Sequence, residues 1–279
     1  MSRLRLALGL AIIGCLAAVA VHAQRSGRGA AAPMYADERG GIPVWELNKE
    51  LPKDVFTFVR VRYSSGGRGY WGGRGRWAID YPDADLNFSY RLAELTAMKV
   101  HPEGIVLDIT DPELFNYPFI YMVEPGALVF SEEEVQTLRR YFAKGGFMMV
   151  DDFWGPDEYD NFYFEIKRVF PDREPVELPL EHPIFHCVMS LKEKPQVPNV
   201  GMGVRSQYDG RTWEDSRDRD PHYKAILDDK GRIMVMICHN TDLGDGWERE
   251  GEDSYYFTEF SEKKAYPLGI NIIFYAMTH

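Results

Sequence analysis

The chain has 279 residues, of which 45% are hydrophobic and 27% are charged. This apolar share excludes an intrinsically disordered chain, and 25 glycines with 17 prolines are too few for a low-complexity one. The formal net charge of −11 argues against a nucleic-acid partner, because an acidic surface repels the phosphate backbone. Length and composition instead predict a folded protein of one or two domains.

The first 23 residues have the layout of a secretory signal peptide. Arg3 and Arg5 precede an uncharged run from Leu6 to Val21, and Val21-His22-Ala23 is a small-residue cleavage site. The run is 16 residues long, shorter than the roughly 20 that cross a bilayer as a helix. We therefore expect residues 1–23 to be removed on export to the periplasm or the exterior.

The alternative to simple export is a lipoprotein. Ile12–Cys15 resembles a lipoprotein box, which would leave Cys15 lipidated, but the residues that follow are apolar where lipoproteins usually turn polar. Cleavage after Ala23 is the leading prediction. Residues 24–54 then form a flexible leader, and the mature chain has no stable membrane span.

From residue 55 onward, short apolar strands alternate with amphipathic helices. Asp83 or Asp85 can cap the first helix, and Ser131 with Glu134 forms a capping box at the start of the second. The predicted elements are the strand Phe56–Tyr63, a helix from Asp83 or Asp85, the strands Gly104–Ile109 and Phe119–Val123, a helix from Ser131 to Lys144, the strand Phe147–Val150, and a helix ended by Pro171. This order predicts a single α/β domain over residues 55–279, with a mostly parallel sheet and helices on both faces.

The second half of the chain is less regular. Tyr223–Leu227 and Ile233–Cys238 are apolar runs joined by a short turn, which is the pattern of a β-hairpin. Leu268–Met277 is apolar nearly all round and predicts a buried helix. Cys187 and Cys238 each lie in an apolar run, so one disulfide and two separate buried thiols are both open interpretations.

A glycine- and arginine-rich loop follows the first strand. Gly67–Gly72 satisfies the pattern GxGxxG but opens no helix, which the dinucleotide fingerprint requires, so no nucleotide cofactor is predicted. Arg68, Arg74 and Arg76 are interleaved with aromatic residues, a combination that suits an anionic or sugar-like ligand or an acidic protein partner. The alternative is a solvated loop whose arginines balance nearby acids.

Polar side chains gather after two other strands. Asp151 and Asp152 follow an apolar strand, and ligands in open α/β sheets bind outside the carboxyl ends of the strands. One of the pair is a candidate general base or metal ligand, or both cap the following loop. A second segment follows another strand and offers His239, Asn240, Asp242 and Asp245. Its spacing departs by one position from a calcium loop, so a divalent metal and a plain turn are both open there.

The usual signatures of catalysis are absent. His182 and His186 are four residues apart, as in zinc-binding helices, but Pro183 between them prevents the helix and predicts structural roles. The sequence has no GxSxG motif, no cysteine at a strand-to-helix turn and no Walker A motif.

Five segments, taken together, resemble one bacterial family. They are Asp80–Phe88, Gly145–Asp152, Leu178–His186, His239–Glu248 and Pro267–Asn271. They are similar to domain-of-unknown-function family 4159 over about residues 55–279. That family looks related to trehalose-utilisation-protein-like domains and, more distantly, to class I glutamine amidotransferases. The resemblance implies a three-layer, flavodoxin-like α/β fold.

The same resemblance argues against amidotransferase chemistry. Amidotransferases place a nucleophilic cysteine on a turn after a central strand, whereas the comparable strand here, Phe147–Val150, ends in Asp151 and Asp152. A carboxylate cannot form the thioester that this chemistry needs. The resemblance therefore implies the scaffold without glutaminase activity.

These observations predict a binding protein of the cell envelope. The leading hypothesis is an exported α/β domain that binds a small polar ligand or an envelope protein partner, with no predicted cofactor and no catalysis. The alternative is an envelope hydrolase acting on carbohydrate or a related polar substrate, with Asp151 or Asp152 as base, His239 as a third candidate, and a divalent metal as an option. The predicted pocket is lined by Asp151, Asp152, Trp154, Asp80, Asp83, Asp85 and the loop His239–Asp245, which includes Asn240, Asp242 and Asp245.

Overall fold

The computed structural model describes residue 39 and residues 41–47, 54–66 and 75–279, all within one unit that runs from Arg39 to His279. The predicted signal peptide, Cys15, most of the predicted leader, and Arg68 and Arg74 lie outside the described residues. In the described part of the chain, every helix is too short or too polar to cross a membrane.

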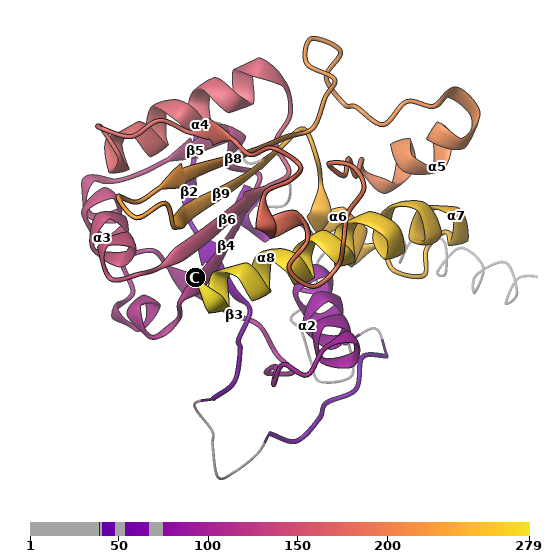
Figure 1. The fold of residues 1–279 in the computed structure, drawn as a ribbon, viewed down its shortest axis with the longest axis horizontal. Coiled ribbons are helices and arrows are strands. Elements are labelled where there is room, and N and C mark those ends of the chain that lie inside the picture. Colours follow the sequence, from indigo (N-terminus) through magenta and orange to yellow (C-terminus); the bar gives the residue numbers. More distant parts are fainter. Residues whose placement is uncertain (1–38, 40, 48–53, 67–74) are drawn as a thin grey trace, which may run out of the picture. The chain divides into compact units, whose positions relative to one another are not determined.

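A seven-stranded sheet forms the centre of the described chain (Figure 1). Its strands are, in spatial order, β3 (Ile105–Asp108), β1 (Val59–Arg62), β4 (Phe119–Val123), β6 (Phe147–Asp151), β9 (Ile233–His239), β8 (His222–Leu227) and β7 (Val176–Glu177). The first five strands are parallel, and the last two are antiparallel to their neighbours. A small second sheet pairs β2 (Ser64–Ser65) with β5 (Leu128–Val129). The predicted mostly parallel sheet and the predicted hairpin are both confirmed.

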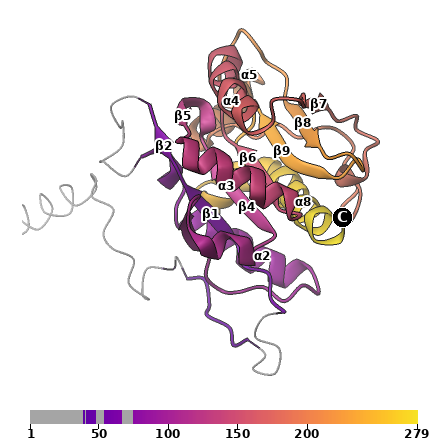
Figure 2. The same cartoon turned by 90° about the vertical axis from the view of Figure 1, so that its left-hand side faces the viewer.

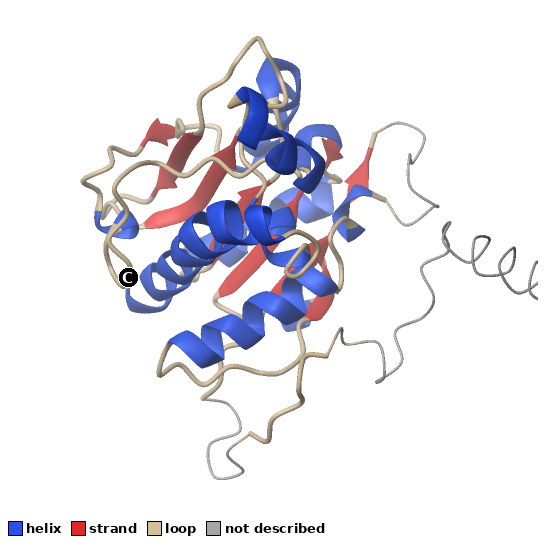
Figure 3. Ribbon diagram, turned by 90° about the vertical axis from the view of Figure 1, so that its right-hand side faces the viewer, coloured by secondary structure: helices blue, strands red, loops and turns tan. Residues whose placement is uncertain are grey.

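Helices cover both faces of the main sheet. On one face lie α3 (Glu132–Ala143) and α4 (Gly155–Val169), and on the other lie α2 (Asp83–Leu95), α6 (Leu243–Glu248) and α8 (Tyr266–Thr278). Figure 2 has α3 in front of the sheet, and Figure 3, from the opposite side, has α8 in front. The other helices are α5 (Val200–Asp209), α7 (Ser254–Tyr256), the π-helix η6 (Phe257–Ala265), and the 3₁₀ helices η2 (Arg76–Ala78), η3 (Pro112–Asn116), η4 (Pro125–Ala127) and η5 (Pro183–Phe185).

Side chains alternate across the central strands and feed two separate cores. In β4, Tyr121 faces α2 and α8, whereas Met122 faces α3 and α4. Every residue of β4 and β6 is buried, which is why Phe119–Val123 and Phe147–Val150 are continuous apolar runs; the buried Asp151 ends β6. The same alternation sends Asp151 toward α6 and His239 toward the core under α4.

Local signals explain most element boundaries. The capping box is present: the Ser131 hydroxyl accepts from the Glu134 N–H at 3.2 Å, and the Glu134 carboxylate accepts from the Ser131 N–H at 2.6 Å. The first strand is shorter than predicted, because before Val59 the chain makes only a single bridge at Phe56. Cys187 and Cys238 are free thiols, so they do not form the disulfide left open by the sequence. Cys238 is buried on β9 as expected, but Cys187 is exposed.

A fully buried ion pair joins β1 to α2. The Arg60 guanidinium donates to an Asp85 carboxylate oxygen at 2.5 Å, and neither side chain is more than 1% exposed. The same guanidinium donates to the carbonyls of Trp77 at 3.1 Å and Ile79 at 2.8 Å. These bonds hold the segment that leads into α2, which carries Asp80.

We expect Asp85→Asn to lower the free energy of unfolding by about 3–5 kcal/mol, because it leaves the buried Arg60 charge without its partner. The matched control is Asp108→Asn, which breaks the half-exposed pair with Arg62 and should cost no more than about 1 kcal/mol. Urea unfolding of the two variants measures the difference. Equal losses of unfolding free energy in the two variants would show that the buried pair stabilises the fold no more than the exposed pair does.

Candidate functional site

Buried carboxylates gather at the carboxyl ends of β4, β6 and β9. Asp80, Asp152 and Asp242 each offer an oxygen within 4.8 Å of the other two, and none is more than 9% exposed. Asp80 Oδ2 has no hydrogen-bond partner. Arg60, whose charge acts on Asp80, is already paired with Asp85. We call Asp80, Asp152 and Asp242 the carboxylate group.

A second set of acids shares Asp80. Asp245 and Glu248 of α6 each offer an oxygen within 4.8 Å of it, but both also pair with Arg249, at 3.3 and 2.6 Å. A Cβ atom at Gly244 would lie 2.4 Å from Asp80 Oδ2, so the absence of a side chain there lets the carboxylate lie against α6. Asp245 and Glu248 are thus already neutralised by Arg249, whereas no member of the carboxylate group forms an ion pair with an arginine within the described residues.

The backbone at this edge is strained. Among the described residues, the non-glycine positions with positive φ are Asp80 (61°), Glu124 (47°), Asp152 (57°) and Asn240 (58°). The last three directly follow β4, β6 and β9. Such conformations cost about 1–3 kcal/mol each and concentrate at functional sites, where the surrounding structure holds them. The strain therefore marks the carboxyl edge of the sheet as the place to look for function.

Burial changes the protonation of these acids. Desolvation, reinforced by the neighbouring carboxylates, raises the pKa of Asp80, Asp152 and Asp242 well above the usual value. Desolvation also raises the pKa of Asp151 and of Glu124 to about 7. Near neutral pH the edge therefore tends to hold protons unless a cation replaces them.

A cavity of about 460 Å³ adjoins the carboxylate group through Asp152. Its lining is Arg76, Glu124, Asp152, Trp154, Asp157, Glu158, Glu214, Asp215 and Arg217. Arg76 is paired with Glu124 at 3.3 Å and with Glu158 at 3.2 Å. Because acids outnumber arginines in the lining, the cavity favours cations and neutral polar groups over anions.

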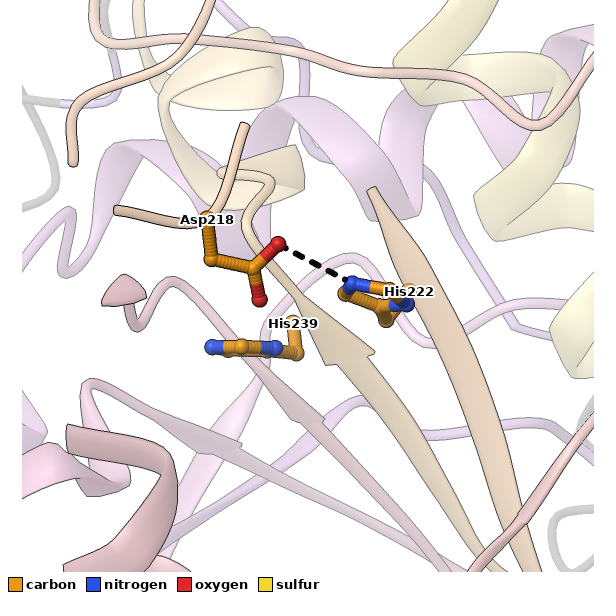
Figure 4. A group of neighbouring side chains, drawn as sticks. All are labelled: Asp218, His222 and His239. Atoms are coloured by element: carbon orange, nitrogen blue, oxygen red, sulfur yellow. Dashed lines mark hydrogen bonds and ion pairs between the residues drawn. The ribbon is translucent and has the colours of Figure 1, made fainter. Parts of the chain in front are cut away.

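A separate polar group lies on the α4 side of the same edge. His222 and His239 are opposite each other in the β8–β9 register, with ring centroids 5.7 Å apart, and His222 Nε2 bonds to Asp218 at 3.2 Å (Figure 4). His239 Nε2 donates to the Gly155 carbonyl at 3.0 Å, while its Nδ1 has no partner. Burial lowers the pKa of His239 to about 4, so this imidazole is neutral at pH 7. We call Asp218, His222 and His239 the histidine group.

Residues 57–277 match the family described as a domain of unknown function (DUF4159). The chain belongs to this family. A search of curated proteins finds no match. The match spans every strand of the main sheet, so the carboxylate group and the histidine group both belong to the DUF4159 domain.

The DUF4159 domain brings part of the predicted pocket together. Asp80, Asp152 and Asp242 form the carboxylate group. Asp151 lies beside it, where Oδ2 accepts from the Tyr121 hydroxyl at 3.2 Å and from the Gly244 N–H at 3.0 Å. The Trp154 indole donates to Asp152 Oδ1 at 3.2 Å.

Other residues of the predicted pocket have different surroundings. Asp85 is committed to Arg60, and Asp83 is exposed in the first turn of α2. The prediction that one of them caps this helix was wrong, because Pro82 holds the N-cap position and makes no side-chain bond there. His239 does not join the carboxylates, because strand alternation sends it to the opposite face of the sheet. The Asn240 side chain accepts from the Gly155 N–H at 2.8 Å and so fastens the loop after β6 to the loop after β9.

The segment expected to be a turn or a calcium loop is instead a strand end followed by α6. Asp242 caps this helix, because its carboxylate accepts from the Asp245 N–H at 2.7 Å. Asp245 in turn accepts from the Val200 N–H at 2.5 Å, which ties α6 to α5.

Sequence reasoning missed Glu124, Asp218 and His222. Glu124 directly follows the predicted strand Phe119–Val123, so the argument that selected Asp151 applied to it as well. The predicted hairpin placed His222 just before one strand and His239 just after the other, but their pairing depends on a register shift between Ile226 and Leu227 that the sequence did not reveal. Asp218 belongs to an irregular segment, and the sequence offered no signal for it.

We expect the metal-free domain to lose stability as the pH rises from 5.5 to 8. Glu124, Asp151 and Glu248 have a pKa near 7 in the fold, raised by burial. Their protonated forms favour the fold, so this stability is full below pH 4 and is lost as the pH passes 7. Each group contributes at most about 1.4 kcal/mol per pH unit.

The Asp151→Asn variant isolates the contribution of one of these acids to the pH dependence, since an amide imitates the protonated acid. Its melting temperature, measured in chelator, should fall less steeply with pH than that of the parent chain. Parallel pH profiles for the variant and the parent would contradict the raised pKa of Asp151.

Proposed function

We propose that this chain is an exported ligand-binding protein of the cell envelope. Its carboxylate group holds a hard divalent cation, Mg²⁺ or Ca²⁺, and presents it to a small polar ligand in the adjoining cavity. The observation that carries the proposal is three buried carboxylates within 4.8 Å of one another that have no paired arginine.

The argument for a cation is electrostatic. Three ionised carboxylates in a low-dielectric interior repel one another and lose their hydration, which is costly unless a positive charge is present. Asp80 Oδ2 is buried and unpartnered, and is therefore free to act as a ligand atom. A set of oxygens with no sulfur or nitrogen suits magnesium or calcium.

The cavity supports a neutral polar ligand, such as a sugar. Asp152 belongs both to the carboxylate group and to the cavity wall, so a ligand there would lie beside the cation. The volume of about 460 Å³ suits a small molecule. The acidic lining disfavours an anion, and Arg76 is engaged by Glu124 and Glu158.

We also infer a flavodoxin-like fold, related to trehalose-utilisation-protein-like domains and class I glutamine amidotransferases. The five parallel strands, numbered along the chain, lie in the order 2-1-3-4-5, which supports the inference. In such folds ligands bind at the carboxyl edge of the sheet, which is where the carboxylate group lies. Export rests on the N-terminal sequence pattern alone.

A saturating divalent cation should stabilise the chain. At a concentration of 100 times Kd, Mg²⁺ or Ca²⁺ adds about 2.7 kcal/mol, which raises Tm by roughly 5–10 °C for a domain of this size. Thermal unfolding at pH 7.5, with and without chelator, measures the shift. Asp152→Asn should abolish most of it, whereas Asp157→Asn, on the same cavity wall but exposed, should retain it. No shift in the parent chain would refute the cation site.

A glycine pair tests the geometry without removing a carboxylate. The methyl group of Gly244→Ala would meet Asp80 Oδ2 at 2.4 Å and displace it, so we expect at least about tenfold weaker cation binding by calorimetry. In the control, Gly201→Ala on α5, the new methyl group would lie 3.5 Å from Asn199 Oδ1, an ordinary contact, so affinity should not change. Equal affinities in the two variants would count against Asp80 as a ligand.

A hydrolase acting on carbohydrate is the second candidate. Glu124 lines the same cavity as Asp152, and its pKa of about 7 lets it exchange a proton near neutral pH. Under this alternative, release of reducing ends from neutral oligosaccharides is lost in Glu124→Gln, while cation binding persists. If the full chain releases no product, the binding function stands and the hydrolase is rejected.

A further inference from the structure

We propose that the histidine group is a second metal site, selective for a nitrogen-preferring divalent cation of the zinc class. Asp218, His222 and His239 each offer one ligand atom, and these atoms lie within 4.8 Å of one another. The site is independent of the carboxylate group, because it uses other residues on the other face of the sheet edge.

Each imidazole has one nitrogen held from outside and the other turned toward the shared space. His239 Nε2 donates to the Gly155 carbonyl at 3.0 Å, and His222 Nδ1 faces a Glu177 oxygen at 3.4 Å. His239 Nδ1 is then unpartnered, and His222 Nε2 bonds only to Asp218, the third member of the group, so a cation bound there would replace the proton between them. Metal-binding histidines in proteins are oriented in this way, by a carbonyl or a carboxylate on the far nitrogen.

The unpartnered Nδ1 of His239 supports a metal site independently of the distances between the three residues. His239 is 2% exposed, and its Nδ1 makes no hydrogen bond within the described residues. A buried acceptor without a partner is costly, and nothing in a purely structural histidine pair explains it. A cation bound at Nδ1 would satisfy it.

The third ligand completes the set. Asp218 bonds to His222 through one oxygen, and its other oxygen lies on the His239 side in Figure 4. Asp218 and His222 are each about one-third exposed, which gives a cation a route from solvent. Ligand atoms about 2.1 Å from a tetrahedral zinc lie about 3.4 Å apart, so separations of up to 4.8 Å must shorten by up to about 1.4 Å. The partly exposed Asp218 and His222 can make this movement toward the buried His239.

The composition of the site selects the metal class. Two imidazoles with one carboxylate suit zinc, iron(II) or a neighbouring transition metal rather than magnesium or calcium. Three protein ligands also leave a coordination position for water. Lys224, two residues along β8 from His222, is the nearby positive charge, and Glu177 and Asp218 offset it.

Calorimetry with Zn²⁺ alone, on the full chain freed of metal, tests the site. We expect one Zn²⁺ per chain at this site, with affinity at least about 100-fold weaker in His222→Gln and in His239→Gln, and unchanged in His101→Gln. Lys224→Met should bind several-fold more tightly, because it removes a repelling charge. Co²⁺ gives a second readout, since visible absorption typical of nitrogen ligation should appear and then vanish in His222→Gln.

Three outcomes would overturn the proposal. They are no Zn²⁺ binding, binding that His222→Gln leaves unchanged, and binding that Asp242→Asn removes while His222→Gln does not. His222 is partly exposed, so its variant should fold even where His239→Gln does not, and urea midpoints verify this.

Discussion

The candidate site depends on one buried guanidinium. Arg60 satisfies Asp85 on α2 and, with its remaining N–H groups, the carbonyls of Trp77 and Ile79. Ile79 immediately precedes Asp80, and Trp77 lies three residues before it, so a single side chain on β1 positions both α2 and the strained residue Asp80. The buried positive charge of Arg60 is therefore neutralised by Asp85. The carboxyl groups of Asp80, Asp152 and Asp242 must be neutralised by protons or by a cation from solvent.

The mixed sheet explains why two chemically different groups lie at one edge. In a parallel sheet all strands have their carboxyl ends at the same edge, and in this chain the segments that follow β4, β6 and β9 supply acids. The antiparallel β8 begins where β9 ends, so its first residue, His222, faces His239 across the ladder. Alternation along each strand then separates the two groups, since Asp151 points to the α6 face and His239 to the α4 face.

Most strand positions and the capping box of α3 could be predicted, because both arise from local patterns. The apolar run before Asp151 placed that residue at the carboxyl edge, and Ser131 with Glu134 marked the start of a helix. What the local pattern could not supply is contact across the fold. Asp80 joins the group through bonds made by Arg60, 20 residues earlier in the chain, and α6 has a sequence of turn-forming residues that only packing converts into a helix. The face occupied by His239 could have been predicted from the alternation of side chains along its strand, although the sequence analysis grouped it with the carboxylates.

The register shift between β8 and β9 decides which face of the sheet His222 occupies. Leu227 pairs with Ile233 beside the turn, but the next pair is Ile226 with Val235, so β9 carries one extra residue at this point. If both strands kept the register of the turn, His222 would lie opposite Cys238 and on the reverse face from His239. A homologous chain that lost this bulge would therefore part the two imidazoles by the thickness of the sheet, while Asp152 and Asp242 would keep their places.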